Sequence, residues 1–111
     1  GQPFEGGLYA GLTSDRDTSM ALVLLQSDEE MSWKKAIAWA EQQGGVLPSR
    51  TDALVLWQNL PKQFKPEWYW IGEEVTDNTA FAWSQFFFNG LQFGTLKSLY
   101  CRCRAVRRVA I

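Results

Sequence analysis

The sequence of 111 residues contains no histidine. Histidine is the only side chain whose unperturbed pKa lies near neutral pH, so its absence excludes Ser-His-Asp and Cys-His catalysis and histidine-bound metals. Cysteine is nearly absent too, because only Cys101 and Cys103 occur. A disulfide between residues this close would close a strained ring, and two cysteines cannot form a structural zinc site. We therefore expect two free thiols, and no metal or cofactor.

The sequence also lacks an excess of one charge and a long apolar run. Lysine and arginine number 11 against 12 acidic residues, so the net charge of −1 does not favour binding to nucleic acid or to an anionic membrane. No segment approaches the roughly 20 apolar residues of a membrane span, and GQPFEGG at the start does not fit a signal peptide. The length and the 46% of hydrophobic residues fit one globular domain, residues 1–111.

What is present begins with a pattern of two strands followed by a helix. The strands are GGLYAGL (6–12) and MALVLLQ (20–26), and the polar cluster TSDRDTS (13–19) between them is typical of a turn. In the helix, Ser32 suits the N-cap and Gly44 the position after the C-terminus. Its predicted buried face, at helical spacing, comprises Trp33, Ala36, Ile37 and Ala40.

A second helix is predicted after LPSR. Ser49 and Asp52 resemble a capping box, and Pro61 ends the helix. The predicted buried stripe comprises Ala53, Leu54, Leu56, Trp57 and Leu60.

The period of the pattern then changes to two, which is typical of strands. The predicted strands are WYWIGEE (68–74), AFAWSQFFF (80–88), LQF (91–93) and LYCRCRAVRRV (99–109). EEVTDNT (73–79) reads as a polar loop, and Asn89-Gly90 is a strong hairpin signal. The order β-β-α-α-β-β-β-β predicts an α+β fold with a mainly antiparallel sheet and two helices.

Residues 81–93 hold six aromatic residues among thirteen. Alternate residues of a strand point to opposite faces, and rings occur on both faces here. Either the strand is covered on both sides, or Phe86, Phe88 and Phe93 form an exposed contact surface of the kind that marks partner sites.

Two charged segments are further candidates. The acidic segment Glu73, Glu74, Asp77 and Asn78 could ligate Ca²⁺ or supply general acid and base groups, although a solvated loop is favoured. The basic segment is expected to form a polar outer face that pairs with the acidic segments 15–17 and 28–30, while the thiols pack in the core. Phosphate binding and stacking on single-stranded nucleic acid are alternatives for its residues, Arg102, Arg104, Arg107 and Arg108.

The motifs, in their order, resemble a known family. SWKKAIAWAEQQGGVLPSRTDALVLWQNL, WYWIGEE, AFAWSQFFFNGLQ and RCRAVRRV together resemble the C-type-lectin-like domains of phage and prophage proteins and some bacterial adhesins, especially Lcl C-terminal-like domains. The resemblance covers residues 7–109. It implies a compact domain with its termini close together, two helices, a twisted sheet and a long loop region that displays ligand-binding residues.

The resemblance also separates scaffold positions from outward ones. The implied scaffold positions are Trp33, Ala36, Gly44, Gly45, Leu47, Pro48, Trp70, Trp83, Phe87, Gly90, Arg104, Ala105 and Val106. The implied outward positions are Ser84, Phe86, Phe88, Asn89, Leu91 and Phe93. The family's first-helix cysteine corresponds to Ala40, and the motifs of calcium-dependent sugar binding are missing, so the resemblance implies calcium-independent binding.

Three hypotheses follow. The first is a non-enzymatic recognition or display module, encoded by a phage or prophage as a tail or surface protein, that binds a protein or glycan through residues 73–93. The second is a structural or assembly module that uses the same aromatic residues as an oligomer interface, and the third is an enzyme. The first places the protein in a virion tail, and the two free thiols are also compatible with the bacterial cytoplasm.

Overall fold

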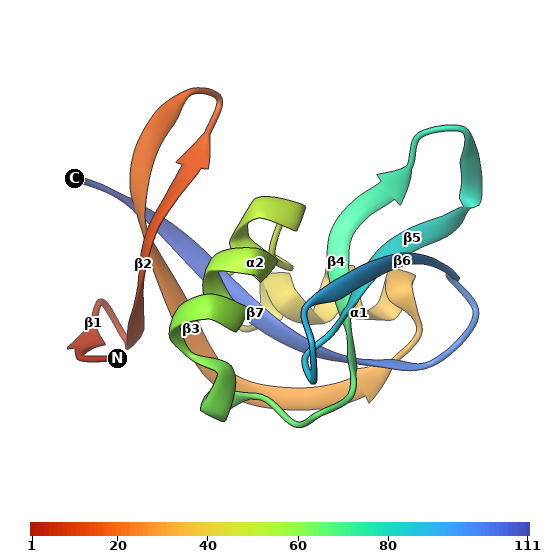
Figure 1. Cartoon of the computed structure of the whole chain (residues 1–111), viewed down its shortest axis with the longest axis horizontal. Helices are drawn as coiled ribbons and strands as arrows, with labels where there is room; N and C mark the ends of the chain where they lie inside the picture. Colours follow the sequence, from red (N-terminus) through yellow and green to blue (C-terminus); the bar gives the residue numbers. More distant parts are fainter.

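The computed structural model describes residues 1–111, which form a single sheet with two α-helices and a 3₁₀ turn (Figure 1). The strands are β1 (Pro3–Phe4), β2 (Gly7–Asp15), β3 (Thr18–Met31), β4 (Trp68–Val75), β5 (Asn78–Phe86), β6 (Leu91–Leu96) and β7 (Cys101–Ala110). The helices are α1 (Trp33–Gln42), α2 (Arg50–Asn59) and the 3₁₀ turn η1 (Pro61–Gln63). The strand order is β1-β2-β3-β7-β4-β5-β6.

The predicted α+β class, with two helices and a mainly antiparallel sheet, is confirmed. All neighbouring strands are antiparallel except β4 and β7, which meet in parallel at Tyr69 and Arg102. The last strand thus lies in the middle of the sheet and joins β1-β2-β3 to β4-β5-β6. Both ends of the chain lie toward the β1-β2-β3 part (Figure 1).

The first two predicted strands are longer than expected. The segment 13–19 does not separate them, because β2 and β3 pair through it and turn only at Arg16 and Asp17, which have φ of 51° and 64°. Residues 28–31 also stay in β3, where they pair with β7 before α1 begins. Polar residues continue these strands because the backbone of a neighbouring strand is available to pair with them.

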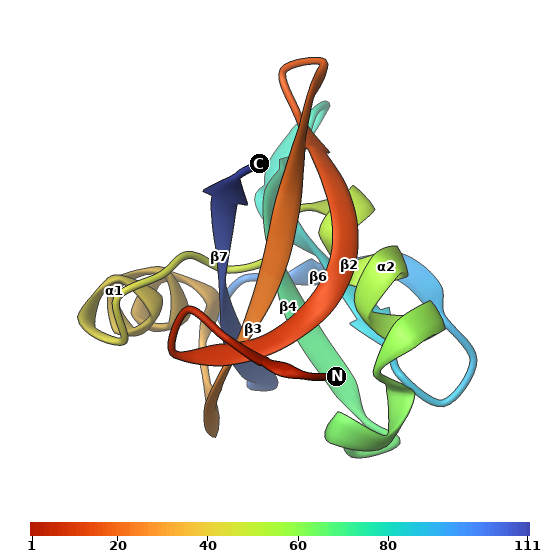
Figure 2. The same ribbon diagram turned by 90° about the vertical axis from the view of Figure 1, so that its left-hand side faces the viewer.

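The helices cover opposite faces of the sheet, as Figure 2 shows. The core under α1 includes Val23, Leu25, Ala36, Ala40, Leu47, Trp70, Ala82, Cys101, Cys103 and Ala105. The core under α2 includes Ala10, Leu22, Leu24, Leu56, Leu60, Tyr69, Phe87 and Val106. The run 21–25 of β3 is therefore buried without a break, since its alternating side chains enter two different cores.

The predicted helix ends are largely confirmed. Ser49 and Asp52 form the capping box of α2, and Gly44 follows α1 with a φ of +84°. One predicted core residue is wrong: Leu54 is 48% exposed. Leu54 follows Ala53 directly, and this one-residue step along the helix turns its side chain away from the buried face formed by Ala53, Leu56 and Leu60.

Asp52 connects α2 to two strands. Its Oδ2 accepts a hydrogen bond from the Ser49 backbone N–H (2.9 Å) and pairs with Arg108 Nη2 of β7 (2.6 Å). Its Oδ1 accepts from the Thr13 hydroxyl of β2. A fully buried carboxylate with these partners is stable only while the partners stay in place.

We expect Asp52→Ala to lower the free energy of unfolding by about 3 kcal/mol, because it removes the carboxylate half of the capping box and leaves Arg108 without its carboxylate. Urea unfolding followed by circular dichroism measures the change. Glu41→Ala, on the exposed side of α1, is the matched control and should stay within about 0.5 kcal/mol of the parent. Equal effects of the two substitutions would contradict this role of Asp52.

Cys101 and Cys103 are free thiols in the core under α1, as the sequence predicts. Burial raises the pKa of each thiol from 9.0 to about 12, and nearby carboxylates add to the effect. Both thiols therefore remain neutral in the native protein at physiological pH, where they act as small apolar residues.

We expect the protein to lose stability as the pH rises from about 9 toward 12. Unfolded thiols lose their protons near pH 8.5, whereas the native thiols keep theirs to about pH 12. The stability contributed by the neutral thiols is thus complete below about pH 8.5 and is lost through this window, because the unfolded state binds fewer protons there. Urea unfolding at a series of pH values measures the loss.

The double variant Cys101→Ala/Cys103→Ala is the control for this pH dependence. Its unfolding free energy should fall less steeply over the same window, since it lacks the two titrating groups. An unchanged slope would assign the effect to other residues.

Candidate recognition surface

The connection between β5 and β6 is held tightly against α2. The Gly90 N–H donates to the Phe86 carbonyl oxygen (2.7 Å), and Gly90 has a φ of +80°. A Cβ at Gly90 would lie 2.9 Å from the Trp57 ring, so no larger residue fits there without a shift. The predicted hairpin is confirmed, but β5 ends at Phe86, not at Phe88.

Phe87 anchors this connection in the core. Its ring stacks on Phe64 at a centroid distance of 4.0 Å and meets Tyr69 edge-on at 5.1 Å. Its N–H donates to the Glu67 carbonyl oxygen (3.1 Å). Because Phe87 points inward, the next residue, Phe88, is turned out and is 70% exposed.

Five apolar side chains around Phe88 are here named the aromatic surface: Trp68, Phe86, Phe88, Leu91 and Phe93. The Trp68 ring stacks on Phe86 (5.0 Å) and contacts Phe93 (5.7 Å), and Phe86 contacts Phe88 (5.9 Å). Leu91 is 52% and Phe93 54% exposed, while Trp68 and Phe86 are half-buried. Rings that touch one another yet remain open to solvent form a ready contact area.

The aromatic surface adjoins an open edge of the sheet. Strand β6 pairs with β5 on one side and has no neighbour on the other. Unpaired backbone N–H and C=O groups at such an edge can pair with another strand. Leu91 and Phe93 belong to this edge strand.

Two of the implied outward residues have different roles. Ser84 is fully buried, and its hydroxyl pairs with that of Thr95 (2.8 Å), because the α1 face of the sheet is covered at this point. The prediction that Ser84 faces outward is therefore wrong. Asn89 is exposed, and its Oδ1 accepts from the Leu91 N–H (3.0 Å) and so helps to hold the turn.

The acidic segment is part of a tight hairpin. Residues 73–75 and 78–79 belong to β4 and β5, so the predicted loop shrinks to a turn at residues 76–77 and the implied long loop region is absent at this position. Glu73 Oε2 accepts from the Arg50 N–H (2.7 Å) at the start of α2, and Glu74 pairs with Lys97. Asn78 Oδ1 accepts from the Ala80 N–H (3.2 Å).

The ten predicted binding residues do not meet in one place. Trp68 pairs with Phe86 at one end of the β4–β5 hairpin, and Val75 pairs with Asn78 at the other. The register of β4 against β5 shifts between Trp70 and Glu74, and the β4–β5 turn lies at the other end of the hairpin from the β5–β6 connection (Figure 1). Glu73, Glu74, Asp77 and Asn78 are thus not part of the aromatic surface. Glu73 is linked to β6 through Arg50, which bonds both Glu73 and Gln92.

The sequence interpretation missed Trp68. Its position opposite Phe86 depends on the register of β4 and β5, which a reading of single strands does not provide. Tyr100, in the β6–β7 connection, is a second exposed ring that was not singled out.

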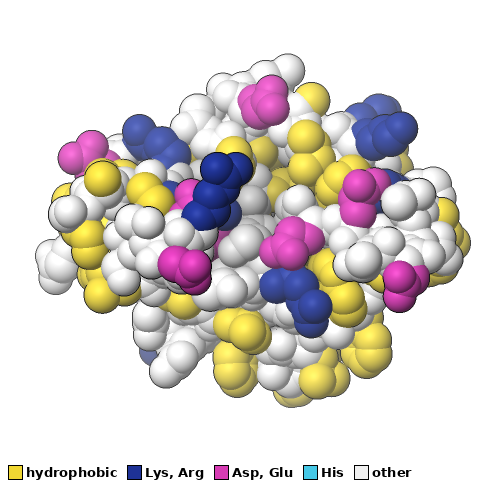
Figure 3. Space-filling model, turned by 90° about the horizontal axis from the view of Figure 1, so that it is seen from above, with side chains coloured by type: hydrophobic (Ala, Val, Ile, Leu, Met, Phe, Trp, Pro, Cys, Tyr) yellow, Lys and Arg dark blue, Asp and Glu magenta, His cyan; other side chains and the backbone are white.

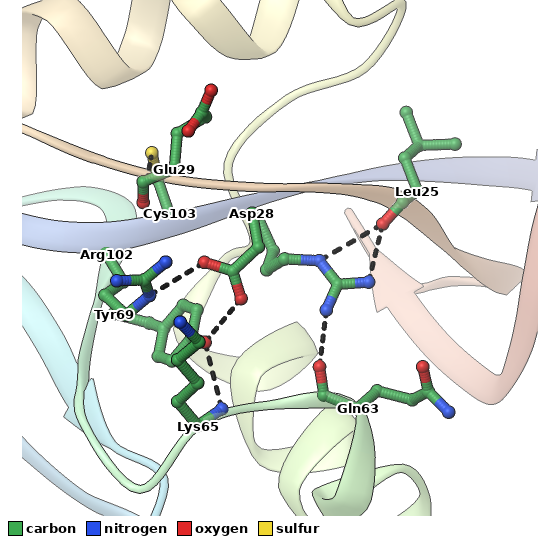
Figure 4. A network of polar contacts seen from close by, with 9 residues as sticks. Leu25, Asp28, Glu29, Gln63, Lys65, Tyr69, Arg102 and Cys103 are labelled. Carbon is green, nitrogen blue, oxygen red and sulfur yellow. Dashed lines mark hydrogen bonds and ion pairs between the residues drawn. The ribbon is translucent and has the colours of Figure 1, made fainter.

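The basic segment is only partly a polar outer face. Arg102 Nε pairs with Asp28 Oδ1 (2.8 Å), which confirms the expected pairing with segment 28–30. No arginine pairs with segment 15–17. Arg104 is buried, contrary to the prediction, because the α2 side of β7 is covered there. Tyr69 also donates to Asp28 (2.6 Å), and burial raises the pKa of Tyr69 to about 12, with that hydrogen bond as the next cause (Figure 4).

Charged side chains of both signs are scattered on the surface seen from above, while hydrophobic side chains reach it in groups (Figure 3). No group of three or more Asp, Glu or Cys side chains is placed to hold a metal ion. Neither helix is long and apolar enough to cross a membrane.

No protein-family model matches the chain, and no curated protein matches it at a significant level.

Truncation of the two adjacent rings Phe87 and Phe88 should change the unfolding free energy by very different amounts. We expect Phe87→Ala to cost about 3–5 kcal/mol of unfolding free energy, because it leaves a cavity beside Phe64 and Tyr69. Phe88→Ala should change stability by less than about 0.5 kcal/mol, because the ring is mostly in solvent. Chemical denaturation of the two variants tests this. A large loss in Phe88→Ala would mean that this ring supports the fold and is not free to bind.

Proposed function

We propose that this protein is a non-enzymatic recognition module that binds a protein partner through the aromatic surface. The observation that carries the proposal is the row of contacting rings around Phe88, in which Phe88 and Phe93 are exposed while Trp68 and Phe86 are half-buried and support them. Hydrocarbon rings supply contact area and contain no acid, base or nucleophile, which favours binding over catalysis.

The surface is well prepared for binding because the protein fixes its shape in advance. Phe87 anchors the turn from below, and Gly90 packs against Trp57. Aromatic side chains have few rotatable bonds, so little entropy is lost when a partner covers them. Such rings are also the side chains that most often dominate binding energy.

The polar groups beside the rings favour a protein over a glycan. Asn89 accepts a bond inside its own turn, and Gln92 bonds Gln85 (2.8 Å) and Arg50. Few side-chain donors and acceptors therefore remain for sugar hydroxyls. The open edge of β6, in contrast, can pair with an extended segment of a partner protein.

The family resemblance places this module in a C-type-lectin-like fold, which we include in the proposal. It is supported by the order of the motifs, by the two helices between β3 and β4, and by the return of β7 beside β3. An origin in a phage or prophage tail or surface protein is the part of the proposal that rests on the resemblance. The short β4–β5 turn narrows the proposed contact region from residues 73–93 to residues 86–93.

A second candidate is an assembly module. The unpaired edge of β6 carries Leu91 and Phe93, and two copies of the chain could pair their β6 edges and cover these residues. This candidate needs no other partner.

The double variant Phe88→Ser/Phe93→Ser tests the proposal. We expect peptides selected against the parent protein from a displayed random library to bind the double variant at least about tenfold more weakly, the effect of losing roughly 1.4 kcal/mol of contact energy. Isothermal titration calorimetry with the selected peptides measures the loss. A glycan array, run with both proteins, tests the other ligand class.

Leu12→Ser/Leu54→Ser is the matched control, since it removes two exposed apolar residues from β2 and α2 and should leave peptide binding unchanged. Selected peptides that bind all three proteins equally would contradict the proposed surface. Light scattering separates the assembly candidate: a dimer at all concentrations that becomes a monomer in Phe88→Ser/Phe93→Ser would favour assembly.

A further inference from the structure

A cavity with a volume of about 430 Å³ lies between the β1–β2 hairpin and β3. Phe4, Leu8 and Leu24 form its apolar lining. Its polar lining comes from Gln26, Gln63 and Arg104. A cavity of this size, mostly apolar with a few polar groups, is typical of a small-molecule site.

Arg104 is the only charged residue of the lining, and it is 6% exposed. Its Nε and Nη2 donate to the Leu25 carbonyl oxygen (3.2 and 2.8 Å), and its Nη1 donates to that of Gln63 (2.5 Å). Figure 4 shows both carbonyl groups directed at the guanidinium. The Leu25 carbonyl is available because the register of β3 against β7 shifts between Leu24 and Asp28.

The Arg104 guanidinium has no counter-ion in contact with it. Its hydrogen-bond acceptors are neutral carbonyls, and no carboxylate oxygen lies within 4.0 Å. The nearby Asp28 carboxylate is bonded through both oxygens to other groups, Tyr69 and Arg102. Asp28 is thus committed to Arg102 and Tyr69 and forms no ion pair with Arg104.

This arrangement leaves both charge and donors unused. A guanidinium has five N–H groups, and three of them are used in the bonds above. Burial lowers the pKa of Arg104, yet arginine stays protonated in proteins. A buried charge without a counter-ion is costly, so an anion that reaches it is bound favourably.

We propose that this cavity binds a small organic carboxylate, whose carboxylate group pairs with Arg104 while its apolar body lies against Phe4, Leu8 and Leu24. A single negative charge matches the single guanidinium of the cavity, and Arg–carboxylate pairs are short and strong in such surroundings. The apolar lining favours a hydrocarbon body over a hydrated ion.

The proposed carboxylate site is independent of the aromatic surface. Its lining comes from β1, β2, β3, η1 and β7, whereas the aromatic surface lies on β4, β5, β6 and the β5–β6 connection. Each proposal can fail without affecting the other.

A titration of the ¹⁵N-labelled protein with 4-phenylbutyrate, followed by NMR, tests the proposal. We expect saturable shifts of the Gly6 and Gly7 amides and of the Arg104 Nε–H. The neutral 4-phenylbutyramide has the same body and should bind at least about tenfold more weakly, because it lacks the charge that pairs with the guanidinium.

Gln26→Glu is the informative variant, because Gln26 is exposed at the cavity and makes no side-chain bond that the fold requires. The added negative charge should weaken 4-phenylbutyrate binding about tenfold or more through repulsion near the guanidinium. Gln42→Glu makes the same chemical change on the exposed side of α1 and should leave binding unchanged.

Three results would overturn the carboxylate site. They are the absence of saturable shifts at Gly6, Gly7 and Arg104, equal binding of the acid and its amide, and equal affinity in Gln26→Glu and the parent. Shifts confined to the Phe88 and Phe93 amides are a case of the first result, since they would place the probe on the aromatic surface.

Discussion

The structure depends on the central position of β7, which is covered on both faces. Toward α1 this strand presents small residues such as Cys103 and Ala105, which let the helix approach closely. Toward α2 it presents Arg104, Val106 and Arg108, so two guanidinium groups enter the interior from one strand. Each then needs acceptors inside the protein, because a buried charge without them would unfold so small a domain. Asp52 supplies them for Arg108, and the carbonyl oxygens of the β3 bulge and of η1 supply them for Arg104.

The aromatic surface is held in place by the packing of buried rings beneath it. Strand β4 contributes Tyr69 to the core under α2, and Phe64 and Phe87 pack around that ring. Because Phe87 is fixed in the core, the path of the β5–β6 turn is restricted. Gly90, which has no side chain, lets the backbone of the turn pack directly against the Trp57 ring. The exposed rings are therefore neighbours of buried rings in sequence, and their direction is set by the core. A surface built in this way needs little rearrangement on binding.

The parts of the fold that the sequence predicts are those decided by near neighbours. Capping by Ser49 and Asp52, the end of α1 at Gly44 and the hairpin at Gly90 depend on a few adjacent residues. The parts that it does not predict depend on distant partners. Ser84 is polar yet buried because its hydroxyl pairs with that of Thr95 on the neighbouring strand, and segment 73–79 forms strand ends because its residues pair with one another across a tight turn. Arginine at position 104 gives no local sign of burial, since only the bulge in β3 makes an acceptor available.

The ion pairs and hydrogen bonds of the acidic residues determine which groups are left for the two proposed sites. Several acidic residues hold the fold together: Asp28 bonds Arg102 and Tyr69, Glu73 bonds the start of α2, and Glu74 pairs with Lys97. The two proposed sites use features of different kinds that these contacts leave free. One is apolar area at the β6 edge, and the other is positive charge beneath the β1–β2 hairpin. Apolar area and a buried cation attract different ligands, and they lie in different parts of the sheet. A domain this small can therefore present two unrelated binding surfaces without either one interfering with the packing that supports the other.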